Sequence, residues 1–589
     1  MGADQPQRRS SFRIGALNHL HVRVLTDVTG IHKEFVYSVP SGWESHPCFG
    51  VGAMVRVVLH GRRVRAWITE VGVEPLEGLA SAPLAKLSSR GPTLELLELS
   101  EWAAWRWAGH RAHFLRTASP PRMVNALPRF QRSRLVFSGD FADLFAHQVC
   151  TFCSAPAQDL FPIAVAAAHR GQALILVPDR LRADQLAKGL SRVGVWAQRY
   201  PQGWAAAAAG ATVVGTLAAA WAPAPELAAV LVIDEHDEAF RSESAPTWSG
   251  REVARERARR AGVPCVLVSP APSLEALRSG SVIRLKRDAE LKAWPDVSVV
   301  DRRVEDPSTA GLYSPTLVKV LRSNQRVACV LNRLGRSLLL ACQLCGELAV
   351  CEECGASMRQ GDRARLDCRT GNHSRPLVCA ECGSTAMKNL RVGVKRAREE
   401  LEALIKEPVA EITAKACEGQ STARVVVGTE AVLHLGRPFD VVAFLEFDQE
   451  LLMPRYRARE QAMALLVRGA RVAGPHDQGG RLLIQTRMPD DPVVRASASK
   501  DPWLLARSER DRRQELGFPP YGALAVVSGV AADEYMEGFG SPSEVRIAHD
   551  PSGSYYLRAV NHEILCDALA SVQRPAGRLR IDVDPVRAL

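Results

Sequence analysis

Seven of the chain's 14 cysteines lie between Cys342 and Cys382. They form three Cys-x-x-Cys pairs and one single cysteine, which are Cys342 and Cys345, Cys351 and Cys354, Cys368, and Cys379 and Cys382. A Cys-x-x-Cys turn directs two thiolates at one ion, and zinc takes four such ligands in a tetrahedron. Three pairs and a single cysteine exceed the needs of one ion, so the pattern predicts two structural zinc sites, one of them altered. Repeated pairs in a chain that we do not expect to be secreted favour metal binding over disulfides or scattered core cysteines.

The composition indicates a large, basic protein. With 589 residues the chain is long enough for roughly three to five domains. A net charge of +11 and a pI near 9.1 favour an anionic partner, although a basic composition alone does not establish nucleic-acid binding. The segment from Met1 to Arg13 lacks the apolar core of a signal peptide, and no uncharged apolar run reaches the about 18–20 residues that span a bilayer. We therefore expect a cytoplasmic protein with reduced thiols and no membrane partner.

The spacing of apolar residues changes along the chain. Residues 20–73 alternate apolar and polar side chains, which predicts a small β domain, and residues 92–116 have helical spacing. From about residue 140 short apolar runs alternate with helical segments, and the same rhythm recurs after residue 310. This rhythm predicts two parallel sheets, each covered by helices on both faces, with the cysteine-rich stretch inserted in the second. The expected strands include residues 173–177, 212–214, 230–233, 265–268, 327–331, 425–427, 441–445 and 482–484.

Two α/β units with a zinc insertion in the second resemble one family, the primosomal protein N′ or PriA replication-restart helicases. Short segments along most of the chain support the resemblance, and they occur in the family's order. Residues 35–40 resemble its FDYxVP pattern, residues 230–240 its DEEHD motif, and residues 268–275 its GSATPSLE motif. Further along, the segments that resemble LNRRG, GTQM, PDFRAxE and ELGYPP are residues 331–335, 428–430, 454–460 and 515–520.

The resemblance implies a multidomain fold. It begins with a β-rich domain at 14–90, similar to the family's domain for DNA 3′ ends, and a shortened winged-helix-like segment at 91–133. A first RecA-like α/β lobe is expected at 134–300 and a second at 301–498, with a zinc-binding module at 340–385 inserted in the second. A small α+β C-terminal domain is expected at 499–589.

The loop that would cradle ATP phosphates is degenerate. A helicase of this family needs the pattern GxxxxGK[ST], in which backbone amides wrap the phosphates and the lysine meets their charge. The equivalent stretch, residues 150–160, contains neither glycine nor lysine. Pro156 removes an amide, and Asp159 would repel phosphate. We therefore expect no conventional ATP binding, although an ATPase with unusual loops remains a competing interpretation.

Two further motifs of the motor are altered. Asp234 and Glu235 stand at a strand end and could hold magnesium, but one residue of the family's acidic motif is missing. This degenerate pair is either a remnant of a nucleotide site or a solvated turn. In residues 466–473, which resemble QVAGRAGR, Ala470 and Ala473 replace the two arginines, and the nearby Arg468 and Arg471 are shifted. A displaced arginine is expected to contribute little to a transition-state charge clamp.

For the zinc module, the resemblance implies that Cys342 and Cys345 share an ion with Cys379 and Cys382. Cys351 and Cys354 would share the other ion with the region of Cys368. There the family's second pair has become Cys368-Arg369-Thr370-Gly371, and glycine cannot ligate. His373 either supplies the missing ligand or is a solvated loop histidine. In either case four protein ligands leave no open position, so the metals are expected to be structural.

The ends of the chain carry the candidate DNA contacts. In the family the aspartate of FDYxVP approaches the terminal base, and Val36 stands there in this chain. The β domain is expected to attract phosphates through its charge, and an ordinary basic surface is the alternative; the residues concerned are Arg56, Arg62, Arg63 and Arg65. A C-terminal helix with Arg507, Arg510, Arg512 and Arg513 either faces DNA or is solvated, and the interleaved acidic residues favour solvation.

We therefore predict a nucleoid-associated primosome protein of the cytoplasm that binds branched, forked and single-stranded DNA. It would help to reload the replication machinery without helicase activity, so we do not expect an enzyme. Zinc is the expected cofactor, and ATP is a doubtful one. Its expected partners are other primosome components and single-stranded-DNA-binding protein. Two alternatives remain open, an ATP-dependent 3′-to-5′ DNA helicase with residual activity and a zinc-dependent protein-interaction scaffold.

Overall fold

A computed structural model describes most of the chain. The described residues are 20–28, 30–31, 33–74, 81–133, 139, 141–304, 311–332, 339–362, 364–368, 371, 373–390, 393–413, 422–550 and 553–586. The chain divides into two compact units, the first comprising Met1–Ala104 and His110–Arg129 and the second Trp105–Gly109 and Phe130–Leu589.

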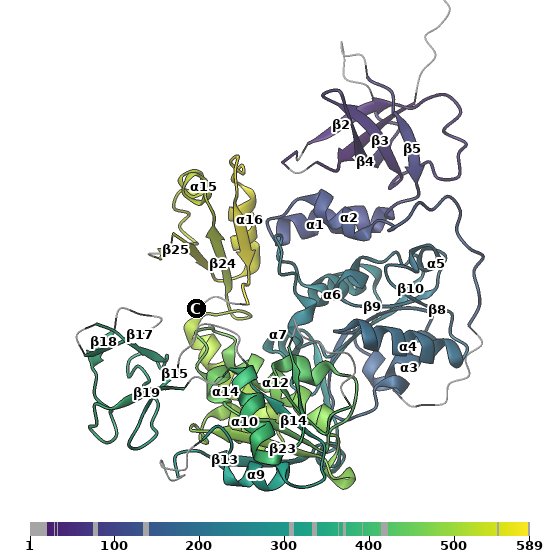
Figure 1. Cartoon of the computed structure of the whole chain (residues 1–589). Helices are drawn as coiled ribbons and strands as arrows, with labels where there is room; N and C mark the ends of the chain where they lie inside the picture. The colour runs from purple at the N-terminus through teal and green to yellow at the C-terminus, as the bar shows by residue number, and fades with distance from the viewer. Residues whose placement is uncertain are drawn as a thin grey trace, which may run out of the picture. The chain divides into compact units, whose positions relative to one another are not determined.

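The first unit contains a five-stranded antiparallel sheet in the order β2-β1-β4-β3-β5 (Figure 1). One face buries Val55, Val57, Ala66 and Ile68, and the other packs Trp67 against Leu115. This division follows from the alternation of side chains along β3 and β4. The elements are β1 (His21–Thr26), β2 (Glu34–Ser38), β3 (Met54–Leu59), β4 (Arg62–Val71), β5 (Lys86–Ser89), α1 (Leu94–Arg106) and α2 (Arg111–Ala118).

The first lobe, as we call residues 141–292, contains a seven-stranded parallel sheet in the order β12-β6-β11-β10-β7-β9-β8. The strands are β6 (Val149–Cys153), β7 (Gln172–Leu176), β8 (Ala197–Arg199), β9 (Thr212–Gly215), β10 (Leu227–Ile233), β11 (Cys265–Ser269) and β12 (Ser281–Arg284). Alternate residues of these strands pack on α3 and α4, and α6 packs on β10 and β11. The helical segments are η1 (Ala142–Phe145), α3 (Phe161–His169), α4 (Arg180–Arg192), α5 (Trp204–Ala208), η2 (Leu217–Trp221), η3 (Glu238–Phe240), α6 (Gly250–Ala261), α7 (Leu274–Arg278) and α8 (Arg287–Lys292).

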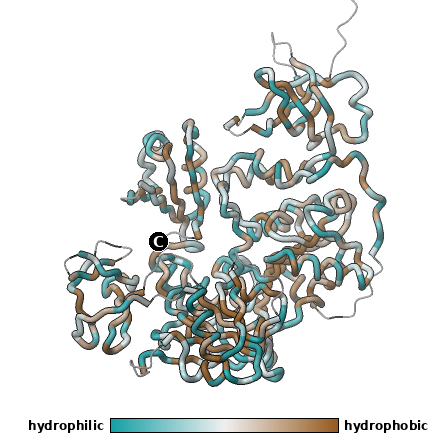
Figure 2. Tube along the Cα trace, viewed as in Figure 1, coloured by the Kyte–Doolittle hydropathy of each residue, from teal (hydrophilic) through white to brown (hydrophobic). Residues whose placement is uncertain are grey.

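The second lobe, residues 296–516, contains a six-stranded parallel sheet in the order β13-β23-β22-β14-β21-β20. Its strands are β13 (Asp296–Asp301), β14 (Val327–Val330), β20 (Val409–Ile412), β21 (Val425–Gly428), β22 (Val441–Phe444) and β23 (Arg481–Thr486). One face packs on α12 and α13 and the other on α9 and α10, so hydrophobic residues concentrate in the sheet (Figure 2). The helical segments are α9 (Pro315–Leu321), α10 (Val394–Ile405), η4 (Glu430–His434), α11 (Asp448–Leu451), α12 (Ala458–Ala473), η5 (His476–Gln478), α13 (Pro492–Ala498) and α14 (Pro502–Leu516).

A cysteine-rich module interrupts the second lobe between β14 and α10. It contains β15 (Leu339–Cys342), β16 (Met358–Gln360), β17 (Arg365–Cys368), β18 (Ser374–Pro376) and β19 (Met387–Leu390). The C-terminal part is an antiparallel sheet in the order β25-β26-β24-β27 with two helices. These elements are β24 (Ala523–Ser528), α15 (Ala532–Phe539), β25 (Arg546–His549), β26 (Tyr555–Ala559), α16 (His562–Ala570) and β27 (Arg580–Val583).

The prediction of two parallel sheets is confirmed. Both lobes are built from parallel strands buried on two faces, which is why they read as continuous apolar runs. The expected domain boundaries stay predictions. The segment Met1–Arg13 and residues 333–335 of the LNRRG-like segment lie outside the described residues. Among the described helices, none combines the length and the apolar character needed to cross a membrane.

One expectation about α14 is wrong. Arg513 neither faces DNA nor is solvated, because its side chain is 1% exposed and pairs with Glu460. Glu509, taken as a sign of a solvated helix, is fully buried and pairs with Arg459 of α12 at 3.2 Å. Both residues lie on the face of α14 that packs inward, and the exposed face keeps Arg510 and Arg512.

Candidate metal centres and the acidic motif between the lobes

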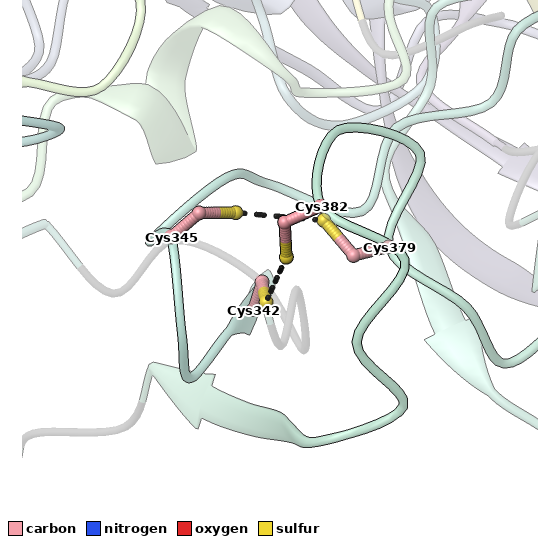
Figure 3. Close-up of side chains that lie close together, drawn as sticks. All are labelled: Cys342, Cys345, Cys379 and Cys382. Atoms are coloured by element: carbon pink, nitrogen blue, oxygen red, sulfur yellow. Dashed lines mark hydrogen bonds between the residues drawn. The ribbon is translucent and has the colours of Figure 1, made fainter.

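The structure gathers Cys342, Cys345, Cys379 and Cys382 into one cluster (Figure 3). The Sγ atoms of Cys342 and Cys382 lie 3.5 Å apart, as do those of Cys345 and Cys379, and all four sulfurs lie within 4.8 Å of one another. Zinc–sulfur bonds of about 2.3 Å in a tetrahedron place sulfurs about 3.8 Å apart. The donor set therefore fits a zinc ion in number, chemistry and spacing.

Each complete Cys-x-x-Cys pair is followed by a glycine that closes its turn. The amide of Gly346 donates to the carbonyl of Cys342, and Gly355 and Gly383 do the same in their own turns, at 2.8–3.1 Å. All three glycines have φ between 71° and 78°, which other residues adopt only at a cost. A glycine directly after each Cys-x-x-Cys pair is visible in the sequence and indicates such a turn, but the prediction of these turns rested only on the cysteines.

The second cluster contains Cys351, Cys354, Cys368 and His373. The Sγ atoms of Cys354 and Cys368 lie 3.4 Å apart, and Nδ1 of His373 lies 3.4 Å from Sγ of Cys351. In each complete turn, the amide of the first cysteine donates at 2.8 Å to the carbonyl five residues later. Cys368 and His373 make the same bond at 2.8 Å. The incomplete turn therefore keeps the local fold of a complete one.

His373 lies against the second cluster. While Nδ1 faces the cluster, Nε2 lies 3.2 Å from a carboxylate oxygen of Glu353. A metal-binding histidine usually donates its second ring N–H to a carboxylate or carbonyl, which fixes the orientation of the ring. Three thiolates and this nitrogen fit a Cys3His zinc site, and four protein ligands leave no open position.

The stretch equivalent to a phosphate loop follows β6 and uses its amides within the protein. The amide of Ser154 donates to the carbonyl of Ser269 at 3.0 Å, and that of Ala157 donates to the carbonyl of Ala293 at 3.2 Å. The amide of Ala155 donates to the side chain of Gln158, and Ala155 packs into the core of the second lobe. A loop whose amides already have partners cannot cradle phosphates in the way that a glycine-rich loop does.

Asp234 follows the central strand β10 and is not part of a solvated turn, because it is 1% exposed. Its φ of 56° lies in the left-handed region, which aspartate tolerates better than most residues. Arg471 of α12 donates two hydrogen bonds of 2.6 Å to its carboxylate, and Arg182 of α4 donates another. Burial would raise the pKa of Asp234, but Arg471 and Arg182 outweigh it and hold the pKa below its usual range.

Arg471 also fills the space beside the degenerate loop. Its Nε donates to the carbonyl of Pro156 at 2.8 Å, so one guanidinium joins the loop to the acidic motif. One turn earlier on α12, Arg468 donates to Asp237 at 2.7 Å. Both shifted arginines therefore reach the acidic motif, and their small contribution to a transition-state charge clamp stays a prediction. The positions assigned to the family's arginines, Ala470 and Ala473, pack into the core of the second lobe instead.

Glu235 faces inward within the first lobe. Its carboxylate accepts from Arg251 at 2.6 Å and from the amide and hydroxyl of Ser273 at 2.7 and 2.8 Å. Both oxygens of the Glu235 carboxylate therefore already accept hydrogen bonds from the protein. Asp234 and Glu235 consequently have arginine partners where a nucleotide site would place a metal ion and water.

The basic residues of the first unit fall on two faces. Arg56 on β3 lies directly opposite Arg65 on β4 and Lys86 on β5, so three cations lie in one row across the sheet. Arg63 lies on the same face, and strand alternation places Arg62 on the opposite one. Only Arg65 of this row has a carboxylate partner in the described part of the chain, Asp27 at 2.8 Å. Like charges directly opposite on a sheet are destabilising, which favours an anion over this face.

Val36, which stands where the family has its base-reading aspartate, is half-buried in β2. Its cross-strand neighbour on β1 is Arg23, which pairs with Glu70 at 3.0 Å. A valine offers no hydrogen bond to a base edge.

Comparison with protein-family models gives no match. A Mycobacterium tuberculosis protein named "Probable replication restart protein PriA" is 26% identical over 641 residues, covering 96% of this chain and 93% of the relative. The corresponding Mycobacterium leprae protein is 27% identical over 595 residues, covering 88% and 89%. "Replication restart protein PriA" of Bacillus subtilis is 28% identical over 347 residues, covering 54% of this chain but only 43% of the relative.

Among solved structures, yeast Dbp5 bound to RNA and ADP BeF3 is similar over 62% of this chain and 88% of its own, with 9% identity and a TM-score of 0.33. So low a TM-score adds no argument. The sequence relatives carry one family name, and the mycobacterial matches run along nearly the whole of both chains. These matches support the assignment of the chain to the replication restart protein PriA family.

Proposed function

We propose that this protein is a primosome component that binds forked or single-stranded DNA, helps to reload the replication machinery, and does not unwind DNA. The observation that carries the absence of a motor is the position of Arg471. Its guanidinium bonds to both the degenerate loop and Asp234, where phosphate and magnesium would have to bind. Family membership supports the role in replication restart.

Forked DNA as the ligand is supported by the cation row Lys86, Arg56 and Arg65. Phosphate contacts need charge more than exact geometry, and they position DNA without reading its sequence. Val36 offers nothing to a terminal base, so the proposal is binding that depends on DNA structure and charge. RecA-like lobes and a winged-helix-like segment at 91–133 belong to the same proposal, as does contact with other primosome proteins.

We also propose that the module holds two zinc ions, one on the four cysteines of the first cluster and one on Cys351, Cys354, Cys368 and His373. Zinc would supply the folding energy of a segment whose own core is small. That core contains six buried residues, of which two are cysteines of the second cluster. The sulfur spacing supports the assignment.

The test is ATP hydrolysis by the zinc-loaded full chain, with and without forked DNA, together with fork binding at several salt concentrations. The proposal expects fork binding that weakens steeply with salt and no DNA-stimulated turnover. Turnover that is lost in Asp234→Ala would favour the alternative of a helicase with residual activity. That alternative has one observation in its favour, since Arg468 and Arg471 keep the spacing of the family's two arginines and face the acidic motif.

Absence of fork binding at low salt would favour the alternative of a protein-interaction scaffold. A matched pair of variants addresses the DNA contacts. Arg56→Ala removes a cation without a carboxylate partner among the described residues, whereas Arg65→Ala removes one that Asp27 already neutralises. The proposal expects the larger loss of fork affinity from Arg56→Ala.

A further inference from the structure

The two lobes meet through a repeated pattern of arginine–carboxylate pairs. α12 belongs to the second lobe and presents Arg468 and Arg471 one turn apart, so both point from the same face. They bind Asp237 and Asp234, which belong to the first lobe, at 2.7 and 2.6 Å. We call these four residues the arginine clamp.

The side chains of the clamp are largely buried, and two of them have a further charged partner, since Arg182 also donates to Asp234 and Arg468 also donates to Glu430. The side chains of Asp234 and Asp237 are 2% and 10% exposed, and those of Arg468 and Arg471 are 17% and 21% exposed. Charged pairs at this depth are poorly screened by salt, and removing one member deprives a buried charge of one of its counter-ions. Each of these bonds therefore resists separation of the lobes much more than a surface ion pair would.

Other contacts reinforce the same seam. Arg457 at the start of α12 pairs with Glu275 of α7, and the amide of Leu274 donates to Glu460 at 3.2 Å. Arg284 of the first lobe pairs with Asp501 at 3.0 Å, and Arg287 donates to the carbonyls of Ser499 and Lys500 at 2.7 and 2.9 Å. The lobes are thus joined at both ends of α12 and beside α8.

In a nucleotide-driven device, the ligand supplies the differential contacts that close two domains, and its loss lets them open. Here the protein's own side chains supply those contacts. Arg471 lies between the loop and the carboxylate of Asp234. Because it is a residue of the second lobe, this contact is available whether or not a ligand is bound.

We propose that the arginine clamp holds the two lobes in one fixed arrangement without nucleotide, and that the acidic motif serves this purpose instead of metal binding. The inference rests on the proposed loss of the motor and extends it. The pair of lobes acts as a rigid frame for DNA and partner proteins. Its arrangement is insensitive to ATP and magnesium.

The test uses the zinc-loaded full chain and reads amide hydrogen exchange and an interlobe distance by fluorescence energy transfer. In the native protein, one narrow distance distribution is expected, unchanged by ATP with magnesium. In Asp234→Asn with Asp237→Asn, which keeps side-chain shape and removes both charges, residues 154–160 and α12 should exchange about tenfold faster or more. The distance distribution should broaden, while β10 and β22 stay protected.

The control is Arg326→Met, which breaks a 2.7 Å arginine–aspartate pair with Asp440 inside the second lobe. It should leave the distance distribution unchanged. If the asparagine variant does not fold, Arg471→Lys serves as the second variant, since lysine keeps the charge but cannot make the two parallel bonds. It should broaden the distribution to a smaller extent.

A broad distribution in the native protein, or one that narrows on addition of ATP with magnesium, would overturn the clamp. So would an asparagine variant that stays folded with unchanged exchange and distance. ATP turnover is measured on the same samples and reports on the proposed function separately. Turnover by a protein with a fixed distance would contradict the absence of a motor and leave the clamp standing.

Discussion

His373→Ala should empty the second metal site and leave the first filled. His373 is the one nitrogen donor of its cluster, with Nδ1 3.4 Å from Sγ of Cys351. If structural zinc binding is worth about 10–16 kcal/mol over four ligands, one ligand contributes about 2.5–4 kcal/mol. The affinity of the second site should therefore fall by a factor of about 10²–10³.

The assay is zinc content after equilibration with a competing chelator whose affinity lies between those of native and variant sites. Native protein should retain two zinc ions per chain and His373→Ala one. His373→Cys should restore the second ion, because sulfur can replace the nitrogen. His549→Ala is the matched control, since His549 lies on the exposed strand β25 far in sequence from the module.

Loss of the second ion should loosen β16, β17 and β18 selectively. The buried residues of that small core include Cys351 and Cys368, whereas the cores of the two lobes contain no member of the cluster. Amide exchange should rise in residues 351–376 and stay unchanged in β14 and β22. A variant that keeps two tightly held ions would refute the assignment of His373 as a ligand.

Three further predictions follow from charges. Since the pKa of Asp234 is lower in the folded than in the unfolded protein, its ionised carboxylate stabilises the fold fully above about pH 4, and this stabilisation is lost as the pH falls further. In Asp234→Asn the free energy of unfolding should therefore depend less on pH between about pH 4 and 2. Burial raises the pKa of Glu450 in α11 to about 7, so the ionised carboxylate destabilises the folded protein increasingly as the pH rises above the pKa of this group in the unfolded chain. Glu450→Gln should therefore stabilise the protein by up to about 3 kcal/mol at pH 8 in urea denaturation and by almost nothing at pH 4. Arg56→Ala with Arg63→Ala should reduce the slope of log affinity for forked DNA against log salt by about 1.4–1.8, and an unchanged slope would remove both residues from the interface.

The parallel sheets were predictable because their strands are apolar on both faces. Apolar runs such as 173–177 and 265–268 can bury all of their side chains only in a sheet that is covered on both faces. They coincide with β7 and β11 to within one or two residues. The cysteine clusters were predictable for a related reason, since the spacing of a Cys-x-x-Cys turn is set by local backbone geometry. The partner of each turn was not local and came from the family resemblance.

The arginine partners of the acidic motif were not predictable from spacing alone. Asp234 and Arg471 are far apart in sequence, and nothing local indicates that one guanidinium would bridge a carboxylate and the carbonyl of Pro156. Arg182 was missed for the same reason. Lys86 could have been found only from the strand register, which places it beside Arg56.

The loss of the phosphate loop and the position of the arginines are chemically linked. A carboxylate at 1% exposure, such as Asp234, requires a cation, and leaving it unpaired would cost about 3–5 kcal/mol. On the proposal that the loop before α3 holds no nucleotide and no metal, that cation comes from the protein. Arg468 and Arg471 keep the three-residue spacing of the family's arginine pair, but they start two positions earlier on α12, and Ala470 takes the core-facing position. Restoring arginine at Ala470 would therefore place a charge in the core of the second lobe, so Ala470→Arg should destabilise the protein and should not restore ATP hydrolysis.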